Sequence, residues 1–242
     1  MRRAREGASG PLFVVADDQF AGRGRHGKVW QAPPGNLNLS LLLINPAPLA
    51  QMPELGFVAG VALHSALCGL LQSSTASEAL KIKWPNDLVY HGAKLSGLIL
   101  EAHQISPNRQ ACIIGIGVNC QAIPEGLPYG ATHLSALAGR EITARDVRDR
   151  LTLTLGLELS IYARGAGFDT IRQRWLARAA GLGTLLTLDT GTARRSGVFQ
   201  TIDLHGRLVL AVDGAEARFD AGDVFLTPMA QSASPRIEME ST

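Results

Sequence analysis

Apolar residues in the first half of the chain gather in short runs that glycine and proline interrupt. Runs of this length between turn residues are typical of strands. We predict strands within residues 11–17, 37–44, 80–90, 93–102 and 110–120. The first of these is expected to be buried. His91-Gly92 is a turn between two strand-like stretches and predicts a hairpin.

Other segments repeat their apolar positions at helical spacing. Residues 53–71 begin with proline and predict a core helix, in which His64 is expected to be a packed residue and not a ligand. Residues 143–164 and 168–180 predict two further helices, with Thr143 as the N-cap of the first. The charges that alternate along residues 143–164 are interpreted as a solvated face.

The pattern changes after residues 179–184. Short apolar strands separated by Asp and Gly turns then predict a small all-β module, a five-stranded barrel. The last residues have little apolar content and are expected to be disordered. We therefore divide the chain into a larger first domain (1–180), a β-module (183–228) and a tail (229–242), with an α+β fold.

Composition limits the possible functions. The 242 residues are 46% hydrophobic and carry 23 basic and 21 acidic side chains, which argues against bulk binding of nucleic acid. The longest apolar runs are too short to span a bilayer, and no apolar segment follows the basic start as in a secretory signal. Cys68, Cys112 and Cys120 form no CxxC pair, so we expect buried thiols in a reducing cytoplasm.

A glycine-rich stretch, AGRGRHGKVW (residues 21–30), contains the spacing GxGxxG. A dinucleotide-binding loop needs a helix directly afterwards, and Pro33-Pro34-Gly35 excludes one. The phosphate-binding P-loop also fails, because Val29 follows Lys28 where that motif needs Ser or Thr. Two interpretations remain: a loop whose backbone and arginines grip a phosphate or carboxylate, or a solvated basic loop.

A second group of polar residues lies in the predicted hairpin. Lys83, Asn86, Asp87 and Lys94 flank its strands, and Asp87 and Lys94 are seven residues apart across the turn. They are placed to face one another or a shared ligand. Alternatively, Asn86 or Asp87 caps the chain reversal as an Asx-turn.

Three long motifs in one order resemble the biotin–protein ligases. GRGRHGKVWQAPPGNLNLSLLL is similar to the pattern GRGRRGRxWxSPxGNLYxSLLL of that family, KWPNDLVYHGAKLSGLILE to KWPND…KLAGILVE, and IIGIGVNC to GIGINV. The resemblance covers about residues 11–227. It implies a class II synthetase-like catalytic domain, with a mixed β-sheet and helices packed on one face, followed by an SH3-like β-barrel.

The resemblance also implies an activity. Such an enzyme uses ATP and Mg²⁺ to form biotinyl-5'-AMP from biotin, and then transfers biotin to a lysine of a biotin carboxyl carrier domain. The lipoate–protein ligases are the nearest alternative, because they share carboxylate adenylation. A second alternative is a non-catalytic ligand-binding homologue. The metal ligands stay unknown.

Site residues follow from the motifs residue by residue. Lys94 would hold the carboxylate of biotin and the α-phosphoryl oxygens, and Lys83 would lie near the phosphates. Asp87 is our candidate to orient or deprotonate the acceptor amine. The catalytic set is Lys94, Arg23, Arg25 and Asp87. The biotin and adenylate site would be lined by Gln19, Gly22, Arg23, Gly24, Arg25, Trp30, Lys83, Lys94, Gly115, Gly117 and Asn119.

The sequence departs from the family pattern in several places. His26 and Lys28 replace arginines, Phe20 stands where a polar or small residue is common, and Ser96 replaces alanine. Family members carry a Ser-Thr-Asn segment before the glycine loop, which hydrogen-bonds the ureido ring of biotin, and we do not find it here. We expect a truncated chain or a start further upstream, no DNA-binding domain and hence no repressor function.

The oligomeric state stays open at this stage. The apolar run at residues 37–43 could pair across a homodimer or simply form core.

Overall fold

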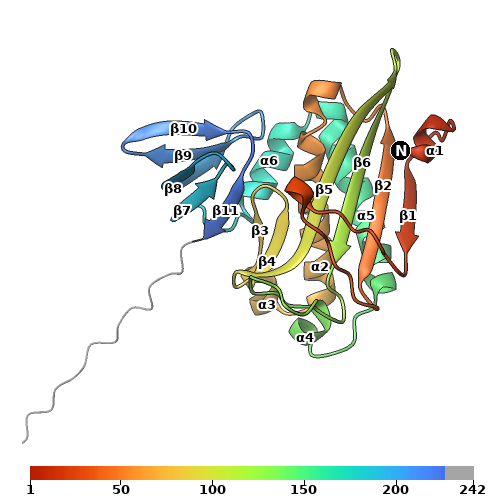
Figure 1. Cartoon of the computed structure of the whole chain (residues 1–242), viewed down its shortest axis with the longest axis horizontal. Coiled ribbons are helices and arrows are strands. Elements are labelled where there is room, and N and C mark those ends of the chain that lie inside the picture. Colours follow the sequence, from red (N-terminus) through yellow and green to blue (C-terminus); the bar gives the residue numbers. More distant parts are fainter. Residues whose placement is uncertain (227–242) are drawn as a thin grey trace, which may run out of the picture.

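The computed structural model describes residues 1–226, and they form two antiparallel sheets (Figure 1). The larger sheet has six strands in the order β1-β2-β6-β5-β4-β3. Their bounds are β1 Leu12–Ala16, β2 Leu37–Ile44, β3 Leu80–Lys83, β4 Asp87–Tyr90, β5 Ala93–Ser106 and β6 Arg109–Val118. The predicted hairpin is β4–β5, and parallel contacts occur as isolated bridges beside this sheet, such as Lys94 with Ala131. The tail predicted to be disordered lies outside the described residues.

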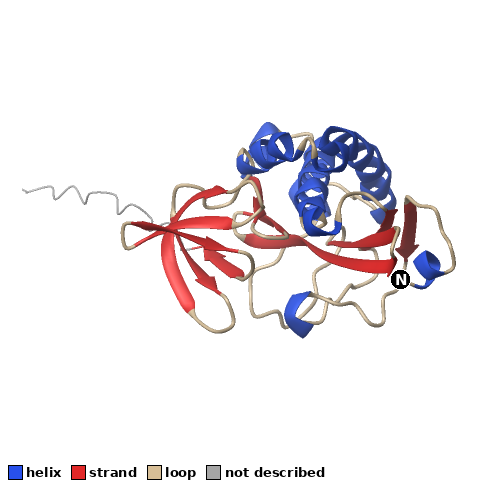
Figure 2. Ribbon diagram, turned by 90° about the horizontal axis from the view of Figure 1, so that it is seen from above, coloured by secondary structure: helices blue, strands red, loops and turns tan. Residues whose placement is uncertain are grey.

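Helices cover one face of this sheet. The long ones are α2 Glu54–Leu71, α5 Ala144–Tyr162 and α6 Phe168–Leu176, and Figure 2 shows them on one side of the strands. The shorter elements are the helices α1 Arg2–Arg5, α3 Ser74–Ala79 and α4 Leu134–Ala138, with 3₁₀ turns η1 Arg25–Gly27, η2 Leu49–Gln51 and η3 Ala163–Gly165. The other face of the sheet is crossed by loops (Figure 2).

The helix predictions are confirmed, with one difference in length. The Thr143 hydroxyl accepts from the backbone N–H of Asp146, whose carboxylate accepts from the Thr143 N–H, so a capping box starts α5. The last predicted helix ends at Leu176 and not at Ala180. The backbone leaves the helix because Ile82 of β3 exchanges hydrogen bonds with Arg178 O and Ala180 N, at 2.9 and 2.8 Å.

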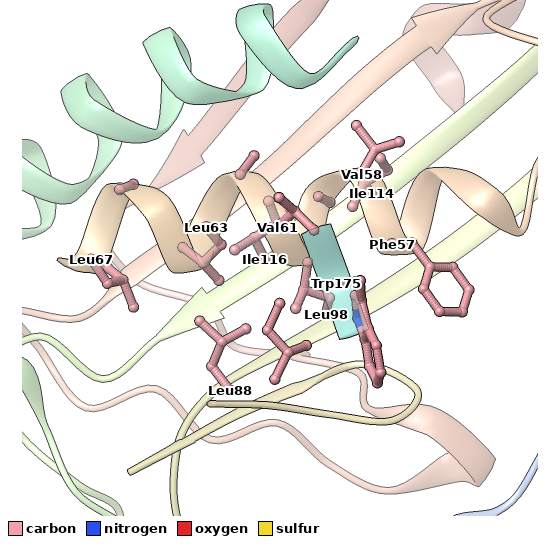
Figure 3. Close-up of a cluster of buried hydrophobic side chains, with 14 of the residues drawn as sticks. Phe57, Val58, Val61, Leu63, Leu67, Leu88, Leu98, Ile114, Ile116 and Trp175 are labelled. Atoms are coloured by element: carbon pink, nitrogen blue, oxygen red, sulfur yellow. The ribbon is translucent and has the colours of Figure 1, made fainter. Parts of the chain in front are cut away.

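The core lies between α2 and the sheet. Figure 3 shows Val58, Val61 and Leu63 of α2 beside Ile114 and Ile116 of β6. By length and composition α2 could cross a membrane, but 72% of that window is buried inside the fold. The helix is therefore the core helix that its sequence predicts.

The polar and thiol groups buried near this core are structural. His64 Nε2 lies 3.0 Å from Leu80 O, and burial lowers the pKa of His64 to about 4, so the ring is neutral and packed, as predicted. The three cysteines are free thiols. Burial raises the pKa of Cys112 and of Cys120 to about 12, so both thiols are protonated at neutral pH.

The prediction that the first strand is buried is wrong. β1 lies at the edge of the sheet and pairs with β2 alone, so Val14 and Val15 are 51% and 42% exposed. β2 has β1 on one side and β6 on the other. Residues 38–42 of β2 therefore pair on both sides within one chain and leave no free edge there for pairing across a homodimer.

The smaller sheet contains the five strands predicted for the C-terminal module. They are β7 Leu185–Asp189, β8 Arg194–Ile202, β9 Leu208–Val212, β10 Ala215–Phe219 and β11 Asp223–Leu226, in the order β10-β9-β8-β7-β11. Several hydrogen bonds join this module to the first part of the chain. Trp84 Nε1 donates to Gly206 O at 3.4 Å, and Arg172 Nη1 donates to Ile202 O at 2.9 Å.

Candidate active site

One row of residues crosses the face of the large sheet that points away from the helices. Its members are paired in register from strand to strand: Asp87 with Gly97, Gly97 with Gly117, Gly117 with Asn38. Side chains alternate along a strand, and Ile116 and Val118 point into the core, so Gly117 faces the opposite side. The row therefore forms a floor with two glycines in the middle and a polar side chain at each end.

The Asp87 end of this floor is an ion-pair cluster. Lys94 Nζ lies 2.7 Å from Asp87 Oδ1, and Lys83 Nζ lies 3.4 Å from Asp87 Oδ2. Asp87 and Lys94 thus face one another across the hairpin, one of the two arrangements that the sequence allowed. A carboxylate that holds two ammonium groups fixes their positions and leaves one surplus positive charge for an anionic ligand.

The glycine loop is a tight hairpin. Gly24 N donates to Lys28 O at 2.7 Å, and Trp30 N donates to Gly22 O at 2.9 Å. A Cβ on Gly22 would lie 2.2 Å from Trp30 O, so this closure requires glycine. The chain reverses at His26, whose φ is 55°, and then runs through an extended segment into β2, so no helix follows the glycines. The helix that a dinucleotide-binding loop needs is therefore absent after residue 27.

The cations of the loop are bound to groups elsewhere in the chain. Arg25 Nη1 donates to Asn86 Oδ1 at 3.1 Å, and its Nη2 donates to Gly222 O at 3.2 Å. Asn86 in turn donates to the carbonyl of Leu98, so it joins the loop to the hairpin and is more than a turn cap.

The other two cations lie further out. Arg23 Nη2 lies 2.9 Å from Glu101 Oε1, and its side chain is 75% exposed. Lys28 Nζ lies 2.6 Å from Asp223 Oδ2 of β11. In this arrangement Arg25 and Lys28 both lie near Asp223, while Arg23 lies apart from them beside Glu101.

Trp30 covers the glycine floor. A Cβ added to Gly117 would lie 2.4 Å from the indole ring, and one on Gly97 would lie 3.4 Å from both Trp30 Cζ3 and Lys94 Nζ. The ammonium of Lys94 is 5.8 Å from the centroid of the Trp30 ring and 5.8 Å from that of Tyr129, distances at which cation–π attraction acts. The two glycines therefore admit a large flat ring, and Lys94 lies beside it.

A cavity of about 360 Å³ opens beside this ring. Trp30, Lys94, Lys28 and Asn119 line it, together with the segment 124–131. Sequence reasoning missed that segment. The signal was its position: residues 119–133 join β6 to α4 without regular structure, and loops of this length in compact folds are usually functional.

The remaining predicted residues occupy the margins of the site. Gln19 is exposed, and its Oε1 would lie 3.1 Å from a Cβ on Gly22. Gly115 lies further along the same face, where the side chain of Ile99 covers it. Asn119 donates to Thr132 O at 3.1 Å, and its carbonyl oxygen is buried without a partner.

The described residues do not fit a resident metal ion. No group of three or more His, Cys, Asp or Glu side chains converges within residues 1–226. Asp87, the carboxylate at the row, is already paired with two lysines. Mg²⁺ commonly binds through one or two carboxylates and the phosphates of a substrate, so a metal ion would enter this site together with a phosphate ligand.

Comparisons with known proteins agree on one family. The model of the biotin/lipoate A/B protein ligase family matches residues 4–119. A biotin--[acetyl-CoA-carboxylase] ligase of Paracoccus denitrificans is 38% identical over 90% of this chain and 92% of its own length. Another of the same name, from Mycobacterium tuberculosis, is 31% identical over 93% of this chain and 82% of its own length.

A solved structure shares the fold. The biotin protein ligase from Aquifex aeolicus, in complex with biotin and ATP, superimposes with a TM-score of 0.75 at 25% identity. The match covers 93% of this chain and 92% of that one.

Proposed function

The chain belongs to the biotin/lipoate A/B protein ligase family, and from this premise we propose that it is an ATP-dependent biotin–protein ligase. The observation that carries the proposal is the position of Lys94. Its ammonium lies between Asp87 and two aromatic rings at the edge of a cavity of about 360 Å³. Such a cavity has the size of a small-molecule site, and the free charge at its edge suits a carboxylate or phosphate.

The proposed reaction has two steps. In the first, a carboxylate oxygen of biotin attacks the α-phosphorus of ATP, and pyrophosphate leaves with the electron pair of the broken P–O bond. In the second, the neutral amine of an acceptor lysine attacks the acyl carbon, AMP leaves, and the amine loses a proton. Neither step requires a nucleophile from the protein, so the residues contribute position and charge.

Lys94 is proposed to act in the first step. Two anions must meet there, and an ammonium close to both reduces their repulsion and fixes their geometry. Asp87 fixes the position of Lys94 through their ion pair. Lys83, the second partner of Asp87, is proposed to add positive charge beside Lys94 for the phosphates. The loop arginines Arg23 and Arg25 are proposed to add charge when they leave their present partners for the ligand.

The glycine loop and Trp30 are proposed to retain the intermediate. An acyl-adenylate is hydrolysed if water reaches it, and a loop that closes over the site excludes water. Trp30 already lies on the glycine floor, and Gly22, Gly24 and the narrow hairpin let the loop lie close to a ligand.

Asp87 is also our candidate for the second step. Each of its oxygens is engaged by a lysine, so orienting or deprotonating the acceptor amine requires the release of one of these contacts. Asn119, with its unpaired carbonyl oxygen in the cavity wall, is proposed to contact the nucleotide, and Gln19, Gly115 and Gly117 to lie along the biotin.

The cofactors and partners follow from the same proposal. Biotin and ATP are the substrates, supported by the Aquifex relative solved with both, and Mg²⁺ is expected to arrive with the ATP phosphates. The acceptor is a lysine of a biotin carboxyl carrier domain, and the cytoplasm is the expected location. We propose residues 1–180 as the catalytic domain and the module from residue 183 as a support for the glycine loop, through Gly222 and Asp223.

Pyrophosphate release with ATP and biotin tests the proposal. We expect release that depends on biotin, and transfer of biotin to an added carrier domain. Release with lipoate in place of biotin would favour the lipoate–protein ligase alternative. The absence of release with either acid, in a chain that is folded, would favour a non-catalytic homologue.

A further inference from the structure

Unpaired polar atoms gather around one residue of the floor. Within residues 1–226, seven buried side-chain nitrogen and oxygen atoms have no hydrogen-bond partner. Four of the seven border Gly117: both polar atoms of Asn38, which pairs with Gly117 in register, Trp30 Nε1, which covers it, and Asn119 Oδ1, two residues further along. Buried polar groups are nearly always bonded, so this concentration needs a cause.

Asn38 is the most unusual member. It is 5% exposed, and neither its amide nitrogen nor its carbonyl oxygen has a partner. Asn36 is just as buried but fully engaged: its Oδ1 accepts from Cys120 N at 2.9 Å, and its Nδ2 donates to Ala122 O at 2.9 Å. Asn36 is thus a structural amide, whereas Asn38, two residues away on the same strand, does no structural work that its contacts reveal.

Its position relates Asn38 to the ion-pair cluster. Lys94 Nζ lies 3.4 Å from the Cβ position of Gly97, and Asn38 is two strands away along the row, about 10 Å at the usual inter-strand spacing. Between them lie only the two glycines, under the indole of Trp30. The indole fills this space in the present structure, so a long acid whose carboxylate meets Lys94 would have to displace it, and its far end would then lie near Asn38.

The chemistry of that far end selects the ligand. A carboxamide offers one carbonyl acceptor and an NH₂ donor side by side. The ureido ring of biotin offers a carbonyl acceptor and N–H donors in the complementary order, and it lies at the opposite end of the molecule from the carboxylate. A dithiolane or plain alkyl end would leave both atoms of Asn38 unpaired.

From this geometry we propose that Asn38 is a substrate-binding residue whose carboxamide hydrogen-bonds the ureido ring of biotin. The inference rests on the proposed function and adds to it a residue that selects the acid. A site that hydrogen-bonds a polar group discriminates strongly against analogues that lack it.

Calorimetric titration of biotin into Asn38→Leu tests the inference. We expect the Kd for biotin to rise about 10- to 100-fold, since the ureido ring would lose a buried pair of hydrogen bonds. Binding of ATP, which has no ureido group, should change less than about twofold. The thermal midpoint of the unliganded variant should stay unchanged or rise, because leucine removes two unpaired polar atoms. If the leucine variant does not fold, Asn38→Ser takes its place, because serine removes the carboxamide and keeps a small polar side chain on the strand.

Asn36→Leu is the matched control for stability. Its amide caps three backbone N–H groups, so this variant should unfold at a lower temperature than the wild type. If Asn38→Leu lowers the midpoint as Asn36→Leu does, or binds biotin within about twofold of the wild type, the inference is wrong. The wild type is titrated with biotin first. If it binds biotin, the proposed function holds even when the Asn38 variants bind equally well. If it does not bind biotin, both the proposed function and the role of Asn38 are wrong.

Discussion

Arg25 Nη1 donates to Asn86 Oδ1 at 3.1 Å, a contact between the glycine loop and the lysine-bearing hairpin. The same guanidinium donates to Gly222 O, and Asp223 Oδ1 lies 3.8 Å from it. Burial lowers the pKa of Arg25, although the charges of Asp223 and Asp87 oppose the change, and an arginine stays protonated at any working pH. Arg25 therefore holds the loop to two other parts of the chain.

Replacing Arg25 should release the loop. Hydrogen bonds to charged groups contribute about 1.5–3 kcal/mol, so we expect Arg25→Ala to speed escape of the adenylate about 10- to 100-fold. The measurement is biotin labelling of bystander lysines on an unrelated protein. Arg145→Ala is the matched control, because Arg145 lies on α5, on the other side of the sheet, and its exposed pair with Asp149 contributes little. Equal labelling by the two variants would contradict the anchoring role of Arg25.

Lys94 should be needed for adenylate formation. Removal of one preorganised charge from a reacting centre typically costs about 10²- to 10³-fold in rate, so Lys94→Ala should lower biotin-dependent pyrophosphate release by about that factor. Lys81→Ala is a matched control, since Lys81 lies on neighbouring β3 without a contact to Asp87. Near-normal release from Lys94→Ala would remove Lys94 from the mechanism.

A methyl group on the floor should displace Trp30. In Gly117→Ala the new Cβ would overlap the indole, and overpacking of this kind typically costs about 1–3 kcal/mol. We expect the tryptophan fluorescence to shift and the KM for biotin to rise. Gly156→Ala, at an exposed position of α5 where a Cβ meets nothing, should instead stabilise the fold by about 0.4–1 kcal/mol with unchanged kinetics. An unshifted spectrum in Gly117→Ala would show that the ring lies elsewhere.

Glu54 should make the free energy of unfolding depend on pH. Burial raises the pKa of Glu54, although a hydrogen bond from the Tyr162 hydroxyl, at 2.9 Å, opposes the shift. A carboxyl with a raised folded pKa contributes stability that is complete below its unfolded pKa of about 4.5 and is lost as the pH rises through the folded pKa. Glu54→Gln keeps an acceptor for Tyr162 and does not ionise.

The variant should therefore be more stable than the wild type at pH 7–8, with a difference that shrinks toward pH 4. Thermal unfolding across this range measures it. A difference that is constant with pH would mean that Glu54 does not titrate on unfolding.

Much of the fold could be predicted from local patterns. The apolar spacing of α2 and the cap at Thr143 are properties of neighbouring residues, so sequence alone identifies them. β1 was predicted as buried because an apolar run does not reveal whether a strand has one neighbour or two. The end of α6 was missed because the backbone after the helix forms hydrogen bonds with Ile82 of β3, a strand almost a hundred residues earlier in the chain.

In the candidate site too, the local contacts could be predicted from the sequence and the long-range contacts could not. Asp87 and Lys94 were placed together because a hairpin brings residues at short separation into contact. The contacts of Arg25 with Gly222 and of Lys28 with Asp223 join residues 197 and 195 positions apart in the sequence. A pattern of apolar spacing cannot predict contacts at such a separation. The distinction between Asn36 and Asn38 also needs coordinates, because two amides on one strand look alike until their partners are known.

The contact between the glycine loop and β11 can form only late in the synthesis of the chain. A ribosome releases the glycine loop, the six-stranded sheet and its helices before the strand that bears Asp223. A nascent chain at that stage has its lysine cluster and glycine floor, but Arg25 and Lys28 lack two of the acceptors that hold the loop down. The closure proposed for the glycine loop would thus become possible only after β11 has been synthesised.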